Sequence, residues 1–260
     1  MEHAELIIDA HGHIGPDVKN WIPFSDAEGM LRTMDLCGVD KVCISSCMAL
    51  KGETTRGNDF VHRISEQYPN RFIGQAVINP RYGKEVVPEM ERCYYQLGVR
   101  YFKIHPGFHG YPANGENYKP FWEFADEKGL VVLCHVWPDP TCNAAAIEKV
   151  VARYGGVKLI AGHSGGVYEE IKLVAALARK YSNVYLDTAA SRQYYGMVEY
   201  YVDAVGPQRV LFGSDFCFAD LRLDLGRALH ARVAEREKRD ILGGNIRRLL
   251  EEAQGTNTKG

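Results

Sequence analysis

The sequence predicts an α/β fold in which eight parallel strands and their helices close into a (β/α)8 barrel, the TIM-barrel arrangement. Short apolar runs alternate with longer amphipathic segments along the chain, which is the pattern of repeated β-α units. Several runs, such as VVLCHV and VKLIAGH, are almost continuously apolar, as expected of strands that are covered on both faces. The length of 260 residues also suits one such barrel, because about 250 residues are typical.

Eight apolar runs are expected to be strands. In chain order they are Leu6–Asp9, Lys41–Ser45, Phe72–Ile78, Arg100–Ile104, Val131–His135, Lys158–Gly162, Val184–Thr188 and Arg209–Gly213. The helices expected between them are Asp26–Leu36, Asn58–Tyr68, Gly83–Gln96, Lys119–Glu127, Ala144–Arg153, Tyr168–Lys180 and Tyr194–Val205. An open, doubly wound sheet is the structural alternative, but no G-x-G-x-x-G motif follows the first strand.

The chain contains no linker, repeat or low-complexity segment that would divide it. Residues 1–253 are therefore expected to form one barrel domain. The remaining segment, Gln254–Gly260, is polar, and it is expected to be a disordered tail.

Composition narrows the classes of function. The formal net charge is −2, which gives no reason to expect nucleic acid or an anionic membrane as a partner. No apolar run approaches the roughly 20 residues of a membrane span, and the polar start does not resemble a signal peptide. A cytoplasmic location is therefore expected, with reduced cysteines. Cys43 and Cys47 are spaced like a metal-binding pair, but no second pair matches them, so structural thiols are favoured.

Candidate catalytic residues follow from the predicted fold, because barrel enzymes place their active sites at the carboxyl ends of the strands. The first strand ends in the motif D-A-H-G-H, and its His11 and His13 would share one face of an extended chain. Later strands end with His135, His163 and Asp215. Imidazole and carboxylate groups that meet at one rim suit a divalent metal. The sequence therefore predicts a metal site at this end of the barrel.

Three further residues are candidates for binding substrate. Lys103 and His105 lie two apart at the end of the fourth strand, and Arg192 lies in the loop after the seventh. The lysine or the arginine would bind a substrate carboxylate. In a site with two metals, Lys103 would instead become a carbamate that bridges them; a buried, ion-paired lysine is the structural alternative.

Taken together and in order, these motifs resemble the amidohydrolase superfamily. Within it, they are similar to the branch of metal-dependent TIM-barrel hydrolases related to the aminocarboxymuconate-semialdehyde decarboxylases. The motifs are D-A-H-G-H at Asp9–His13, N-D at Asn58–Asp59, P-N-R-F-I-G at Pro69–Gly74, K-I-H-P at Lys103–Pro106, the strand-end His135, G-H at Gly162–His163, F-G-S-D at Phe212–Asp215 and G-N-I-R-R-L-L at Gly244–Leu250. They span nearly the whole chain. The segment between the first and second strands is shorter than in those decarboxylases, which counts against a decarboxylase pocket.

The resemblance implies roles for individual residues. His11, His13, His135 and Asp215 are implied as metal ligands, and His163 as the acid–base residue beside the metal. Asp215 is also implied as the acceptor of a proton from metal-bound water. The implied cofactor is one divalent metal ion, with zinc expected first and manganese or iron as alternatives. A second metal with carbamylated Lys103 is the less favoured arrangement.

The expected function is hydrolysis of an amide, ester or lactone bond in a small molecule by a metal-activated water. The alternative is a metal-dependent decarboxylase or hydratase that acts on a small carboxylic acid. A decarboxylase should gather cationic groups around a substrate carboxylate, whereas a neutral pocket would favour hydrolysis. A catalytically silent barrel is disfavoured by the complete ligand set. The expected partner is a small-molecule substrate, and homodimer formation is left open.

Overall fold

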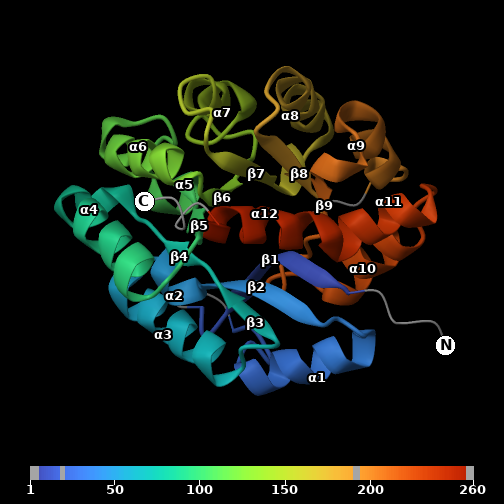
Figure 1. Cartoon of the computed structure of the whole chain (residues 1–260), viewed down its shortest axis with the longest axis horizontal. Coiled ribbons are helices and arrows are strands. Elements are labelled where there is room, and N and C mark those ends of the chain that lie inside the picture. The colour runs from blue at the N-terminus through green and yellow to red at the C-terminus, as the bar shows by residue number, and fades with distance from the viewer. Residues whose placement is uncertain (1–5, 18–20, 190–193, 256–260) are drawn as a thin grey trace.

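The computed structural model describes residues 6–17, 21–189 and 194–255 and shows a ring of parallel strands surrounded by helices (Figure 1). One sheet contains β1 (Ile8–Ile14), β2 (Lys41–Ser46) and β3 (Phe72–Gly74). The other contains β4 (Ala76–Val77), β5 (Tyr101–Ile104), β6 (Val131–His135), β7 (Lys158–Gly162), β8 (Val184–Asp187) and β9 (Val210–Leu211). β3 and β4 occupy the single strand predicted over Phe72–Ile78, which is interrupted at Gln75.

Backbone hydrogen bonds close the ring between the first strand and the last. The Ala10 N–H donates to the Phe212 carbonyl at 2.9 Å, and the Asp215 N–H donates to the His11 carbonyl at 2.8 Å. On the other side of the ring, the Gln75 N–H donates to the Ile44 carbonyl at 2.8 Å and keeps the interrupted strand in place. The predicted (β/α)8 barrel is confirmed.

Helices surround the strands, and each of the seven predicted helices has a counterpart. The helices are α1 (Ala27–Cys37), α2 (Cys47–Leu50), α3 (Thr54–Gln67), α4 (Gly83–Glu91), α5 (Pro106–His109), α6 (Lys119–Lys128), α7 (Ala144–Val151), α8 (Tyr168–Lys180), α9 (Met197–Val205), α10 (Leu221–Leu229), α11 (Glu235–Arg239) and α12 (Asn245–Gly255). Polar caps explain several boundaries. The Asp26 carboxylate accepts the Gly29 N–H at the start of α1, and Gly38 ends that helix with a φ of 70°.

Strand side chains alternate between two apolar cores. In β6, Val131 and Leu133 belong to the cluster inside the barrel. Val132 and Cys134, between them in sequence, belong to the larger cluster between strands and helices. This alternation follows from the two-residue period of a strand, and it explains why the strand reads as continuously apolar.

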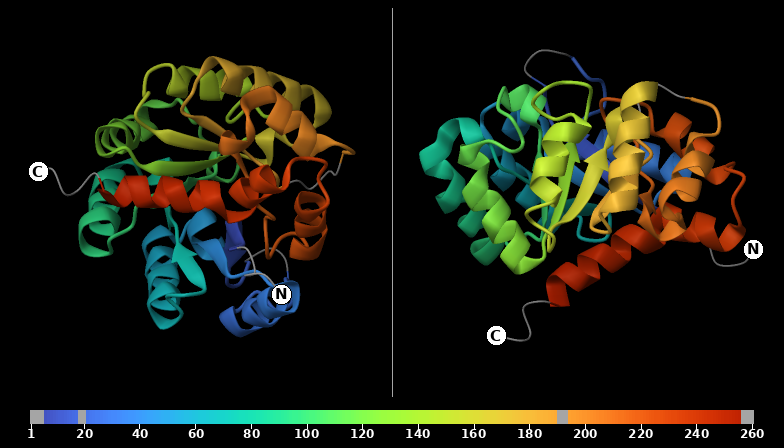
Figure 2. Two further views of the ribbon diagram at one scale, coloured as in Figure 1. Left: turned by 45° about the vertical axis from the view of Figure 1, so that its right-hand side comes forward. Right: turned by 90° about the horizontal axis from the view of Figure 1, so that it is seen from above.

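The last helix closes one end of the barrel. α12 crosses the ring of strands in Figures 1 and 2, and its Ile246, Leu249 and Ala253 are buried in the cluster inside the barrel. The helix continues through Gln254 and Gly255, so these two residues, predicted as part of the tail, are helical. Residues 256–260 lie outside the described residues. Because α12 covers the amino-terminal ends of the strands, the opposite end is left to form a site.

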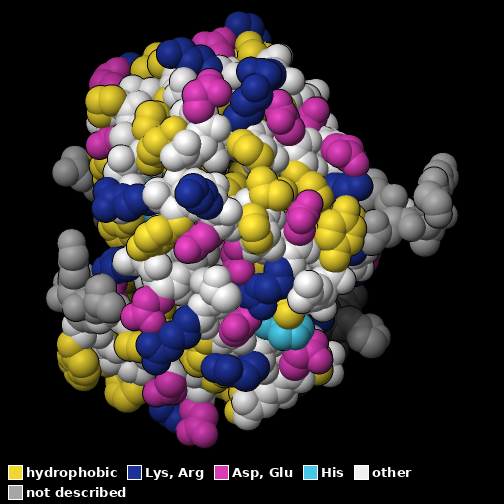
Figure 3. Space-filling view, turned by 90° about the vertical axis from the view of Figure 1, so that its left-hand side faces the viewer, with side chains coloured by type: hydrophobic (Ala, Val, Ile, Leu, Met, Phe, Trp, Pro, Cys, Tyr) yellow, Lys and Arg dark blue, Asp and Glu magenta, His cyan; other side chains and the backbone are white. Residues whose placement is uncertain are grey.

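On the side that carries α4, basic and acidic side chains are interspersed (Figure 3). All seven cysteines are free thiols, and Cys43 and Cys47 are both buried. None of the described helices combines the length and apolar character needed to cross a lipid bilayer.

Shortening Leu249 to alanine is expected to lower the free energy of unfolding by about 2–5 kcal/mol, because it opens a cavity in the floor of the barrel. Urea denaturation followed by circular dichroism measures this change. Arg247→Ala on the same helix is the control, since the Arg247 side chain is 59% exposed, and its effect should stay within about 0.5 kcal/mol. Equal losses in both variants would contradict a sealing role for α12.

Candidate active site

β1 carries both histidines of the D-A-H-G-H motif and extends to Ile14, beyond its predicted end. Asp9 pairs with Val42 and Gly12 pairs with Ile44, so three steps along β1 match two along β2. This extra residue is a β-bulge, a feature that re-aims side chains next to active sites. The chain passes so close to β2 there that a Cβ on Gly12 would lie 2.5 Å from Cγ1 of Val42. Glycine at this position therefore permits the bulge.

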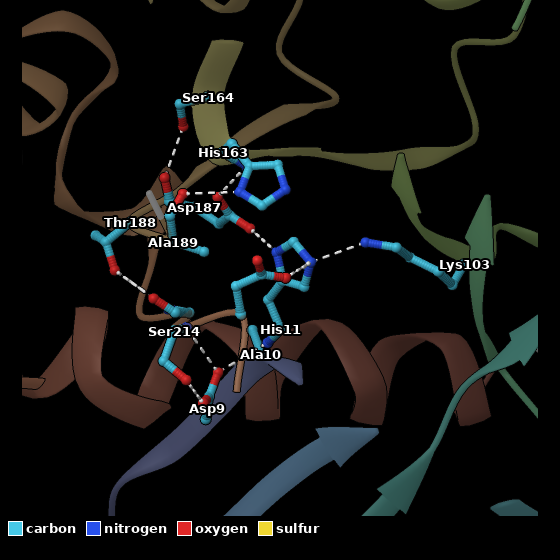
Figure 4. A network of polar contacts seen from close by, with 12 residues as sticks. Asp9, Ala10, His11, Lys103, His163, Ser164, Asp187, Thr188, Ala189 and Ser214 are labelled. Carbon is cyan, nitrogen blue, oxygen red and sulfur yellow. Dashed lines mark hydrogen bonds and ion pairs between the residues drawn. The ribbon is translucent and has the colours of Figure 1, made fainter. Parts of the chain in front are cut away.

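The His11 ring lies between a carboxylate and an ammonium group (Figure 4). Its Nδ1 is 2.6 Å from Oδ2 of Asp187, and its Nε2 is 2.8 Å from Nζ of Lys103. All three side chains are fully buried. Burial, followed by the Lys103 charge, lowers the pKa of His11 well below its usual value. The ring is therefore neutral and carries a single proton.

That proton is on Nδ1. An ammonium group only donates hydrogen bonds, so Nε2 of His11 accepts from Lys103 and Nδ1–H donates to Asp187. Burial raises the pKa of Asp187, and the Lys103 charge opposes that rise. A carboxylate that fixes the tautomer in this way leaves the lone pair on Nε2, where it accepts from Lys103 in this structure and could bind a metal instead, as in histidines that bind metals.

Asp215 faces both histidines of β1. Its Oδ1 is 3.0 Å from Nε2 of His13 and 3.5 Å from Nε2 of His11. Nδ1 of His13 is held by the Ser45 hydroxyl at 2.8 Å. Burial by itself would raise the pKa of Asp215, but the hydrogen bond from His13 and the nearby His163 and Lys103 lower it overall. Asp215 is therefore an ionised carboxylate.

His163 joins the same group from the end of β7. Its backbone N–H donates to Oδ1 of Asp187 at 2.6 Å, and its Nδ1 lies 3.2 Å from the Ala189 carbonyl. A carbonyl only accepts, so Nδ1 carries the proton and Nε2 is free. Burial lowers the pKa of His163 to about 4. Ligand atoms of His11, His163 and Asp215 all lie within 4.8 Å of one another, and two neutral imidazoles with one carboxylate suit a divalent metal.

The strand ends around this group have a constrained backbone. His163, Ser164 and Asp215 have φ values of 63°, 47° and 60°, in the left-handed region that costs non-glycine residues about 1–3 kcal/mol each. Hydrogen bonds hold them there: the Ser164 hydroxyl donates to the Asp187 carbonyl at 2.7 Å. Such strain is typical of functional sites.

Asp9 connects β1 to the segment that bears Asp215. Its Oδ1 accepts the His11 N–H at 2.9 Å and the Ser214 N–H at 3.1 Å, and the Ser214 hydroxyl donates to Oδ2. Burial raises the pKa of Asp9 to about 7, against the opposing effect of these hydrogen bonds. Asp9 therefore positions two candidate ligands without facing the cavity itself.

A cavity of about 230 Å³ opens above this group. One wall is a stack of aromatic rings. The ring centroid of His105 lies 3.8 Å from that of Phe108 and 3.8 Å from that of His135. The centroids of His135 and Trp137 are 6.0 Å apart. The Phe108 N–H donates to Nδ1 of His105 at 3.1 Å, so neutral His105 carries its proton on Nε2. The other lining residues are His13, Lys103, His163, Asp215 and Phe218.

The structure thus brings nearly all predicted site residues to one place. His13, Lys103, His105, His135, His163 and Asp215 line the cavity, and His11 lies against His13 and His163. Arg192, predicted to bind substrate, lies outside the described residues. The three-residue ligand group contains His163, which was predicted as an acid–base residue, and does not contain His13 or His135.

Sequence reasoning missed Asp187, Trp137 and Phe218. Asp187 directly follows the apolar residues V-Y-L of β8, so the rule that selected the other strand-end residues also applies to it. Trp137 and Phe218 lie in loops, where no periodic pattern marks them.

Solved structures with this fold include several enzymes. An uncharacterised TIM-barrel protein from Bordetella bronchiseptica has a TM-score of 0.79 and 17% identity, covering 95% of this chain and 99% of that one. The 5-carboxyvanillate decarboxylase LigW from Sphingomonas paucimobilis has a TM-score of 0.76 and 15% identity, covering 95% and 99%. A dihydroxybenzoic acid decarboxylase from Polaromonas, with bound manganese and 2-nitroresorcinol, has a TM-score of 0.75 and 16% identity, covering 99% and 100%. No curated protein sequence matches the chain.

Replacing Asp187 with asparagine is expected to weaken metal binding about 10- to 100-fold. The amide has one acceptor oxygen, so its NH2 group must face either Nδ1–H of His11 or the His163 N–H. Metal retained against a graded chelator, read by inductively coupled plasma mass spectrometry, measures the loss. Asp203→Asn, an exposed position on α9, is the control. If folded Asp187→Asn protein retained metal as well as wild type, Asp187 would not be needed to position His11 and His163 for metal binding.

The family follows from a match over almost the whole chain. A family profile described as Amidohydrolase matches residues 8–251, a range that contains every described residue of the candidate site. The resemblance inferred from the motifs is therefore confirmed. The chain belongs to the amidohydrolase family and is a metal-dependent enzyme of that superfamily, built on a TIM barrel.

Proposed function

We propose that this protein is a metal-dependent decarboxylase of a small, flat, unsaturated carboxylic acid. The observation that carries the proposal is the pairing of flat ring walls with a buried cation in one cavity. Its volume of about 230 Å³ is below the roughly 300–1,000 Å³ of pockets for drug-sized ligands. The substrate is therefore small.

The cation is Lys103. Burial lowers the pKa of Lys103 to about 8, with Asp215 and Asp187 opposing the shift, so most of the ammonium stays protonated at neutral pH. A cationic pocket is what separates a decarboxylase of a carboxylic acid from a hydrolase of neutral bonds. Two structural neighbours are named as decarboxylases of aromatic acids. These points favour decarboxylation over the amide, ester or lactone hydrolysis expected from sequence.

One metal ion is proposed, held by His11, His13, His135 and Asp215, the set that the family resemblance implies. His163, whose ligand atom also lies within 4.8 Å of those of His11 and Asp215, is assigned to proton transfer. Nδ1 of His135 is buried with no hydrogen-bond partner among the described residues, which is consistent with an open ligand position at this ring. A divalent metal bound there would act as a Lewis acid toward substrate oxygens. Zinc and manganese both accept histidine and carboxylate ligands, and manganese occupies one structural neighbour. Lys103 serves as a cation rather than as a carbamate bridge.

The protein side chains then have separate tasks. The Lys103 ammonium pairs with the substrate carboxylate, and Nε2–H of His105 donates to a second substrate oxygen. The stacked rings of His105, His135 and Trp137 orient a flat substrate and exclude water. When the bond to the carboxylate carbon breaks, its electron pair stays on the substrate carbon that bore the carboxylate, and carbon dioxide leaves. His163 delivers to that carbon a proton that it has taken up from solvent.

Purified protein reconstituted with zinc or manganese is expected to release carbon dioxide from at least one hydroxybenzoate or unsaturated dicarboxylate. Lys103→Met should lower kcat/KM at least about 100-fold, because a buried charge-assisted contact to the carboxylate is lost. Lys84→Met, an exposed position on α4, should be unaffected. Carbon dioxide trapping and ¹³C NMR of the products measure the reaction. Turnover of esters, amides or lactones without release of carbon dioxide would show that the protein is a hydrolase and not a decarboxylase. A hydrated product would indicate a hydratase.

Metal content separates the ligand role from the proton-transfer role. Wild type should hold about one equivalent, and His11→Ala/His13→Ala and His135→Ala should hold little, because each loses ligands. His163→Ala should keep its metal and lose turnover; His230→Ala, exposed after α10, should keep both. Inductively coupled plasma mass spectrometry measures each protein. If His163→Ala lost its metal and His135→Ala kept it, His163 would be the ligand and His135 would not. About two equivalents of metal in wild type would support two metals bridged by carbamylated Lys103.

A further inference from the structure

The indole of Trp137 stands at one end of the stack of rings that walls the active-site cavity. Trp137 lines that cavity, and its ring lies at 22° to the His135 ring, with 6.0 Å between the centroids. The His163 ring meets the indole edge-on, at 89° and 5.8 Å. The indole therefore lies beside a proposed metal ligand and beside the proposed proton donor.

The position of the indole depends on Gly166, a glycine that follows the turn at His163. A Cβ at Gly166 would overlap Cζ3 and Cε3 of Trp137 and would lie 2.6 Å from Cη2. These three atoms belong to the six-membered ring of the indole, so that edge of Trp137 rests directly on the Gly166 backbone. Because protein interiors are close-packed, any side chain at this position would force the indole to move.

Backbone hydrogen bonds hold the Trp137 main chain in place. Its N–H donates to the Cys142 carbonyl at 3.4 Å, and its carbonyl accepts the Asp139 N–H at 2.7 Å. The Asp139 carboxylate in turn accepts the Thr141 N–H at 2.8 Å. A displaced indole would therefore have to rotate about its side-chain bonds, away from Gly166, and the cavity is the open space that it borders.

A flat ring held in this way selects ligands by size, because a clash with the wrong ligand is itself a source of specificity. The cavity of about 230 Å³ is already below the usual range for drug-sized ligands. We propose that Trp137 determines the substrate size that the cavity accepts: it admits a single ring, or a chain of similar length, and excludes a fused second ring. Gly166 keeps the indole at that position. The inference rests on the proposed function only in placing the substrate in this cavity.

Two coloured phenols test the role of Trp137. 2-Nitrophenol and 1-nitro-2-naphthol carry the same neighbouring nitro and hydroxyl groups and differ by one fused ring. Neither has a carboxylate, so absorbance titration of manganese-loaded protein measures binding without decarboxylation. Wild type should bind 2-nitrophenol at least about 10-fold more tightly. Trp137→Ala should reverse the preference, because the second ring fills the space of the indole. Trp21→Ala, which removes a side chain that is 88% exposed, should keep the wild-type preference.

Gly166→Ala tests the support of the indole. It should weaken binding of 2-nitrophenol at least about 10-fold, because the added methyl group pushes the ring into the cavity. Trp137→Ala/Gly166→Ala should bind like Trp137→Ala, since the methyl group then meets no ring. Gly196→Ala is the matched control: Gly196 has a φ of 72°, close to the 70° of Gly166, and an added Cβ there meets no atom within 4 Å. It carries similar backbone strain without the clash. Circular dichroism confirms that each variant is folded.

The outcomes separate this inference from the proposed function. An unchanged preference in folded Trp137→Ala would overturn the size selection and leave the proposed decarboxylation standing. An equal loss from Gly166→Ala with and without the indole would show that Gly166 acts through backbone strain and would overturn its role here. If wild type bound neither compound, the proposed metal-bearing cavity would itself be contradicted, and this inference with it.

Discussion

Two oxygen atoms of one buried carboxylate hold together segments that lie far apart in the sequence. Oδ2 of Asp187 faces Nδ1 of His11, and Oδ1 accepts the backbone N–H of His163, each at 2.6 Å. The first contact chooses the tautomer of His11 and thereby directs its Nε2 toward Lys103 and Asp215. The second sets the left-handed turn at His163. Both imidazoles obtain their orientation from β8, a strand that itself contributes no proposed metal ligand.

The barrel separates the part that maintains the fold from the part that carries the chemistry. At the α12 end, apolar side chains such as Ile246 and Leu249 fill the interior. At the opposite end, the bulge in β1 and the positive φ angles at His163 and Asp215 gather polar groups in a small volume. Regular packing at one end offsets the strain at the other, which is the usual division in TIM barrels. Gln75 is an exception, since it is a buried polar residue at the remote end.

Hydrophobic periodicity was enough to predict the fold, because buried parallel strands alternate with amphipathic helices along the whole sequence. Periodicity did not show two local features. β1 continues to Ile14 through a bulge, and the third strand breaks at Gln75, directly after Gly74. The rule of polar residues after apolar runs located His135, His163 and Asp215, but it was not applied to Asp187. Which histidines approach Asp215 depends on side-chain direction, and a one-dimensional pattern does not contain that information.

The position of the closing contacts in the chain has a consequence for biosynthesis. Asp9 and Ser214, which join the first strand to the last, are 205 residues apart. β1 therefore leaves the ribosome long before the segment that completes it, and its apolar inner face has no final partner during most of translation. High contact order of this kind slows folding and exposes intermediates to aggregation.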